Sequence, residues 1–145
     1  MGIITEKYIP ELEKYIQEAV KSGDKYDFID PAYDITDELE ELENPIEAVK
    51  PIFEMIERSP DIDYGGPGPL GSFLEKFSGK GYEELLLESL HRKPVPFTIH
   101  LLHCMINDEK DPMRDSYLEL MKAIAENTSM PENVRNEAKD SLSYF

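Results

Sequence analysis

Apolar side chains recur every three or four residues along most of this 145-residue chain, which is the spacing of one face of an α-helix. The pattern first runs from residue 5 or 10 to residue 22, and Gly23 is well placed to end that helix. No segment alternates apolar and polar residues, so the sequence predicts an all-α protein with more than about 55% helix. Prolines and glycines divide the later part into helices expected at 45–58, 69–78, 82–92, 97–107, 113–127 and 131–143.

The segment before this long periodic stretch follows the pattern less well. Residues 24–34 are rich in acids and turn formers and are expected to form a loop. A short acidic helix at 36–43 would follow, with Thr36 as its N-cap. Further along, Pro51 interrupts the apolar stripe of 45–58 and is expected to kink that helix or to mark an irregular turn.

The order of the helices suggests how they pack. They favour an irregular stack of antiparallel helix pairs, a HEAT-like α-α superhelix, with a globular six- to seven-helix bundle as the alternative. The length fits a single helical domain, 1–145, with an N-terminal helix and acidic segment over 1–43 and three helix pairs over 44–145. The expected pairs are 45–58 with 69–78, 82–92 with 97–107, and 113–127 with 131–143.

Charge is distributed unevenly along the chain. The net charge of −16 comes from 31 acidic and 15 basic residues, and residues 1–64 alone hold 18 acids and 6 bases. From Asp27 to Glu47 there are nine acids and no Lys or Arg. Nucleic acids and anionic membranes are bound mainly through Lys and Arg, so neither is an expected ligand. A run of like charges repels itself, and its presence suggests a surface for a basic partner.

Aromatic residues accompany these acids, as they do in protein interfaces. Tyr26, Phe28 and Tyr33 lie within the acidic segment, and a second acidic group occupies the turn-rich loop 61–69, where Tyr64 is expected to be exposed. The alternative interpretation is a solvated acidic surface without a partner. The predicted partner-binding residues are Asp27, Asp30, Tyr33, Asp34, Asp37, Glu38, Glu40, Glu41, Asp61, Asp63 and Tyr64.

Three segments resemble a known group of proteins. They are PIEAVKPIFEMIER at 45–58, DIDYGGPGPL at 61–70 and GYEELLLESL at 81–90, followed by Arg92-Lys93-Pro94. They resemble small acidic immunity proteins of bacterial polymorphic toxins, including those of contact-dependent growth inhibition. The resemblance runs from residue 45 to 143, is most specific in the Gly-Gly-Pro-Gly-Pro turn, and transfers no residue role. It implies a compact or HEAT-like helical fold and the neutralisation of a cognate toxin.

A toxin that acts on nucleic acid needs a basic groove, so an acidic inhibitor suits a nuclease. The expected function is therefore an immunity protein that occludes the basic active site or substrate groove of a toxin domain. The alternative is a helical-repeat protein-interaction adaptor unrelated to toxins. The single cysteine, Cys104, permits no internal disulfide, and the N-terminus does not resemble a signal peptide, so a cytoplasmic location is expected. The oligomeric state is left open, with a monomer favoured.

No pattern of residues indicates catalysis, a cofactor or a metal ion. His100, His103 and Cys104 share one expected helix but lack the further ligand that zinc requires, and packing explains them better. The spacing of Asp27, Asp30 and Asp34 differs from that of a calcium loop. The loop 61–69 lacks the Lys-Ser/Thr of a phosphate-binding loop, and its prolines remove N–H donors. The sequence thus predicts a non-enzymatic binding protein.

Overall fold

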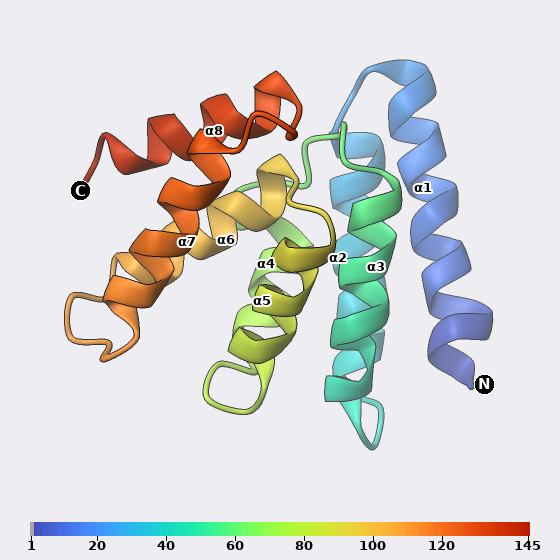
Figure 1. Cartoon of the computed structure of the whole chain (residues 1–145). Helices are drawn as coiled ribbons and strands as arrows, with labels where there is room; N and C mark the ends of the chain where they lie inside the picture. Colours follow the sequence, from blue (N-terminus) through green and yellow to red (C-terminus); the bar gives the residue numbers. More distant parts are fainter. Residues whose placement is uncertain (1) are drawn as a thin grey trace. The chain divides into compact units, whose positions relative to one another are not determined.

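The computed structural model describes residues 2–145, and the chain is 72% helical (Figure 1). The described residues form eight α-helices and no strand, which confirms the prediction of an all-α fold. No helix in this part of the chain is both long and apolar enough to cross a lipid bilayer. The α-helices are α1 (Ile9–Ser22), α2 (Tyr26–Glu40), α3 (Val49–Arg58), α4 (Gly68–Glu75), α5 (Tyr82–Arg92), α6 (Pro96–Ile106), α7 (Arg114–Glu126) and α8 (Glu132–Leu142).

Two short irregular helices precede regular ones. A π-helical turn at Ile4–Tyr8 leads into α1, which ends at Gly23 in the left-handed conformation (φ 73°), as the sequence predicts. A 3-10 helix at Pro45–Ala48 leads into α3. Pro51 lies in the first turn of α3, where a missing N–H costs little, so the irregularity precedes Pro51.

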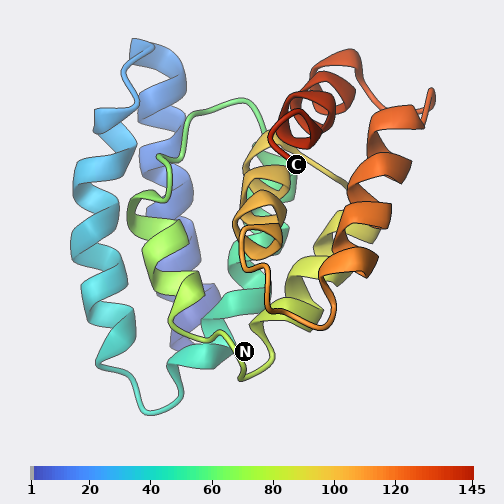
Figure 2. The same ribbon diagram turned by 90° about the vertical axis from the view of Figure 1, so that its left-hand side faces the viewer.

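The chain divides into two compact units. One comprises the described residues up to Leu87 and the other comprises Glu88–Phe145, so the division falls within α5. In the first unit, α1 and α2 run antiparallel and side by side, and α4 packs against α2 (Figure 2). The expected pairing of 45–58 with 69–78 is therefore not the main contact of α4. In the second unit, α7 packs against α8 as expected, and α6 contacts both.

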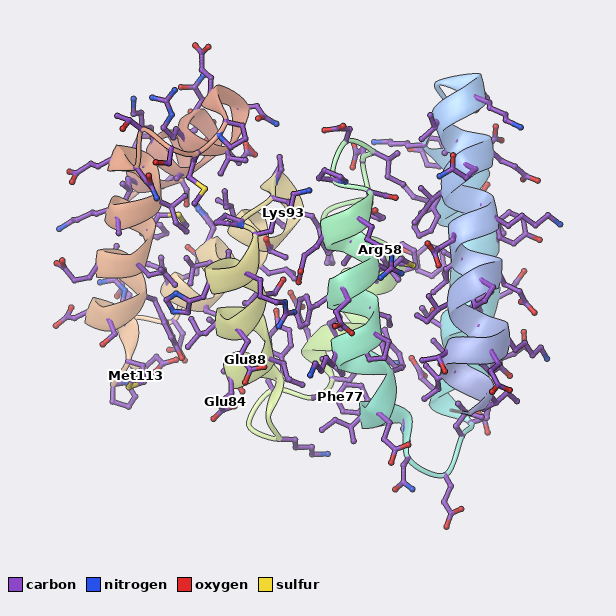
Figure 3. All side chains as sticks on the ribbon, turned by 45° about the vertical axis from the view of Figure 1, so that its right-hand side comes forward. Arg58, Phe77, Glu84, Glu88, Lys93 and Met113 are labelled. Carbon is purple, nitrogen blue, oxygen red and sulfur yellow. The ribbon has the colours of Figure 1, made fainter. Side chains whose placement is uncertain are left out.

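An ion pair joins α3 to α1 at the surface of the first unit. Figure 3 shows Arg58 extending from the end of α3 toward α1, where its Nη2 lies 3.4 Å from Oε1 of Glu13. Beneath it, the apolar faces of α1 and α3 are buried. Their largest fully buried side chains are Leu12, Ile16, Ile52, Phe53, Met55 and Ile56.

The main departure from the sequence prediction is α2. Residues 26–40 form one continuous helix, whereas the sequence predicted a loop at 24–34 and a short helix at 36–43. The Asp24 carboxylate, just before the helix, accepts a hydrogen bond from the Tyr26 N–H (2.9 Å) at its first residue. Thr36 is not an N-cap, because it is buried inside the helix and donates to the Tyr33 carbonyl (3.1 Å).

Burial explains why this helix forms despite Pro31 in its interior. Proline removes one backbone hydrogen bond and costs about 3 kcal/mol in a helix interior. Each large apolar side chain contributes about 1.5–3 kcal/mol when fully buried, so four of them outweigh that cost. The buried apolar residues of α2 are Phe28, Ile29, Ala32, Ile35 and Leu39.

Candidate protein-binding face

The solvent side of α2 carries most of the residues that the sequence predicted for partner binding. They recur every three or four residues, so the helix places them on the side opposite its buried stripe. We call this set the acidic face. Its members, all exposed, are Asp27, Asp30, Tyr33, Asp34, Asp37, Glu38 and, one residue beyond the helix end, Glu41.

Ion pairing separates the acidic face from its neighbour Glu40. Among residues 2–145, none of its six acids forms a salt bridge. Glu40 differs from them, because it is only partly exposed and pairs with Lys76, just after α4. Glu40 therefore links α2 to the residue that follows α4. The six acids of the acidic face form a strip of uncompensated negative charge about 20 Å long.

Two exposed tyrosines give this region apolar contact area. Tyr33 lies within the acidic face and is 45% exposed, and Tyr26, at the start of α2, is 54% exposed. They are seven residues apart, which is two helical turns and about 10 Å. Phe28, which the sequence placed beside them as a possible anchor, is fully buried and belongs to the core. Tyrosines of this kind are the usual energetic anchors of protein interfaces.

A groove of about 680 Å³ opens beside the first residues of α2. The last turn of α1 supplies Val20, which is 57% exposed, and the loop after α3 supplies Asp61 and Asp63. Lys25 reaches across the groove: its Nζ lies 3.3 Å from Asp63 Oδ2 and 5.4 Å from the centre of the Tyr26 ring. The remaining lining residues are Ala19, Gly23, Asp24 and Ile62.

Asp63 is held in place by its own loop. Its Oδ1 accepts a hydrogen bond from the Gly65 N–H (2.8 Å), and this bond, assisted by Lys25, holds the pKa of Asp63 below its usual value. Gly65 has φ 93°, and a Cβ there would lie 2.8 Å from the Gly68 Cα. The glycine-rich loop is thus a tight structural turn, as the sequence analysis favours.

Tyr64 does not belong to the surface, so the expectation that it is exposed is wrong. Its side chain is 1% exposed and packs edge-on against Phe28, with ring centres 5.4 Å apart. Its hydroxyl donates a hydrogen bond to the Ser59 carbonyl, and burial raises its pKa above the usual value. The buried Tyr64 side chain therefore connects the loop to α2 through its contact with Phe28. Of the loop residues predicted for partner binding, only Asp61 and Asp63 are exposed.

The histidines of α6 form a packed cluster in the second unit. His103 Nδ1 lies 2.6 Å from Ser141 Oγ of α8, and the Phe145 ring packs against His103 with centres 4.9 Å apart. Burial, with a smaller contribution from His100, lowers the pKa of His103. Cys104 Sγ lies 3.7 Å from His100 Nε2, one turn away on the same helix, a proximity that the sequence analysis did not consider.

Comparisons with known proteins give no further guidance: no protein-family model, curated protein or solved structure matches this chain. The interpretation of the acidic face therefore depends on its own geometry and charge.

Proposed function

We propose that this chain acts by binding a protein with a basic surface, and that the acidic face of α2 is the contact. The supporting observation is six exposed carboxylates that share one side of a helix with Tyr33 and form no ion pair among residues 2–145. Leaving these charges together destabilises the free protein through mutual repulsion. A partner rich in Lys and Arg would remove that repulsion and would associate faster because opposite charges steer the encounter.

We further propose that the partner is a bacterial toxin domain and that the chain is its immunity protein. The resemblance of 45–58, 61–70 and 81–90 to such proteins supports this, as does the acidic character of the face. Nucleases bind phosphates through basic grooves, and a row of carboxylates spaced along one helix can occupy such a groove. Inhibition would then require occlusion and no chemistry by this chain.

Growth rescue tests the immunity function. The probe is the C-terminal domain of any large secreted protein whose gene lies immediately upstream of the gene for this chain, expressed in the cytoplasm with and without this chain. We expect the domain alone to stop growth and co-expression to restore it. If the domain is toxic and co-expression gives neither rescue nor a complex, or if no secreted protein is encoded there, the immunity function is wrong. A stable complex with a non-toxic partner would favour the adaptor alternative.

Binding kinetics test the acidic face itself. In one variant Asp34, Asp37, Glu38 and Glu41 become Asn or Gln, and in a matched control Glu126, Glu132, Glu137 and Asp140, exposed acids of the second unit, are neutralised equally. The first set should lower the association rate about tenfold or more at low salt, and the second set much less. Tyr33→Ala should instead raise the dissociation rate, since an anchor is lost. Equal effects of the two sets would show that net charge alone matters.

A further inference from the structure

The groove at the start of α2 already contains a cation, and that cation belongs to the protein itself. Lys25 Nζ lies 3.3 Å from Asp63 Oδ2 and 5.4 Å from the centre of the Tyr26 ring. A carboxylate and an aromatic ring close to the same ammonium make a favourable environment for a positively charged group. The groove is therefore shaped and charged to hold such a group.

The acidic side chains of the groove are fixed before any ligand arrives. Asp63 Oδ1 accepts the Gly65 N–H, and Asp24 Oδ1 accepts the Tyr26 N–H (2.9 Å). Asp63 Oδ2 accepts from the Lys25 ammonium (3.3 Å), which a ligand could replace, and Asp61 adds a third negative charge from the same loop. Because the Asp24 and Asp63 side chains are already held by backbone hydrogen bonds, a ligand would bind them at a smaller entropic cost.

Lys25 occupies this groove weakly. Its side chain is 42% exposed and that of Asp63 is 60% exposed, so solvent screens their attraction. An ion pair of this kind changes an equilibrium constant by a few-fold at most. Lysine also uses the groove poorly, because a single ammonium can neither stack flat on Tyr26 nor donate two parallel hydrogen bonds.

We propose that this groove binds the guanidinium of an arginine side chain presented by the basic partner, and that Lys25 is its intramolecular competitor. The guanidinium would donate to the outer oxygen of Asp63 and stack on Tyr26 in place of the Lys25 ammonium. Exposed Val20 supplies apolar contact for the aliphatic part of the arginine. This inference rests on the proposed function in one respect: the arginine belongs to the same partner that contacts the acidic face.

The test is an NMR titration of the whole chain with N-acetylarginine methylamide, followed by backbone amide shifts. We expect saturable shifts at residues 20–26 and 61–65, and weaker binding of the lysine analogue. Lys25→Met should tighten binding about threefold, and Asp63→Asn should weaken it about threefold. Asn keeps the oxygen that accepts the Gly65 N–H, so the loop should retain its shape.

The matched controls separate a site from general attraction. Lys21→Met and Glu18→Gln make the same charge changes at exposed positions that do not line the groove. Both should leave the affinity within about 1.5-fold of the parent protein, since exposed charges outside the groove are screened. The proposal is overturned if the shifts spread along the acidic face, or if Lys25→Met and Lys21→Met have equal effects.

The same variants distinguish the arginine site in the groove from the acidic face as the partner's contact. If the partner's binding changes in the acidic-face variant but not in Lys25→Met or Asp63→Asn, the proposed arginine site in the groove is wrong. The acidic face is then still supported as the contact. If the arginine probe saturates the groove while the partner binds the acidic-face variant as well as the parent protein, the arginine site in the groove is supported. The proposed contact along α2 is then wrong.

Discussion

At the scale of single residues, His103 is partly buried and has contacts from two parts of the chain. Ser141 Oγ lies 2.6 Å from His103 Nδ1, and the Tyr144 and Phe145 rings pack against the imidazole. His100 lies one turn away on α6. Protonation would place a charge in this apolar setting beside a second histidine. The neutral imidazole is therefore favoured in the folded protein, which is why the pKa of His103 is lowered.

This shift predicts how stability depends on pH. The unfolded chain binds a proton at His103 near pH 6.5, whereas the folded protein resists it, so the contribution to stability is present above pH 6.5 and is lost as pH falls further. We expect the free energy of unfolding, measured with urea, to decrease between pH 7 and pH 5, and His103→Gln to reduce that slope. The exposed His91→Gln is the control and should leave the slope unchanged. Identical slopes in both variants would contradict the assignment.

Tyr64 illustrates what the sequence could not reveal about a residue. Its neighbours Asp61, Asp63 and two glycines indicate a surface loop, and that loop is present. The side chain is nevertheless buried, because Phe28, thirty-six residues earlier, supplies an apolar contact and the Ser59 carbonyl accepts its hydroxyl hydrogen. Contacts between distant segments decide burial here, and no local pattern contains them.

At the scale of elements, α2 is the one α-helix within residues 2–145 that the sequence prediction misplaced. The other helices follow from apolar spacing and from Pro or Gly near their ends. In α2 the same spacing exists, but Pro31 and the density of acids favour a loop when the segment is considered alone. Packing against α1 and α4 reverses that preference. The acids were identified from sequence, whereas their common face and the groove depend on this helix being continuous.

The ends of α2 predict opposite effects for two similar substitutions. Asp27 lies in the first turn, near the positive end of the helix dipole, whereas Glu38 lies in the last turn, which has no basic residue. Asp27→Asn should lower the free energy of unfolding, and Glu38→Gln should raise it, each by about 0.3–1 kcal/mol at low salt. Chemical denaturation at 10 mM and 500 mM NaCl is the measurement. Changes of the same sign would mean that net charge outweighs the dipole.

At the scale of the whole molecule, the charge of −16 should govern the response to salt. Salt shortens the range of repulsion from about 30 Å at 0.01 M to about 10 Å at 0.1 M. We therefore expect the midpoint of thermal unfolding, followed by circular dichroism, to rise by roughly 2–5 °C between 10 and 200 mM NaCl. The variant with four neutralised acids on α2 should rise less. A midpoint that falls with salt would mean that attractive ion pairs dominate.

The division of α2 into a buried and an exposed side has an evolutionary consequence. Phe28, Ile35 and Leu39 hold the helix in the fold, whereas Tyr33 and the acids around it contribute little to the core. Substitutions on the exposed side are therefore nearly neutral for folding, and most surface changes alter stability by less than about 0.5 kcal/mol. If the proposed partner changes during evolution, we expect the residues of the acidic face to vary before the buried residues of α2. Specificity can then drift in single steps while the architecture is inherited unchanged.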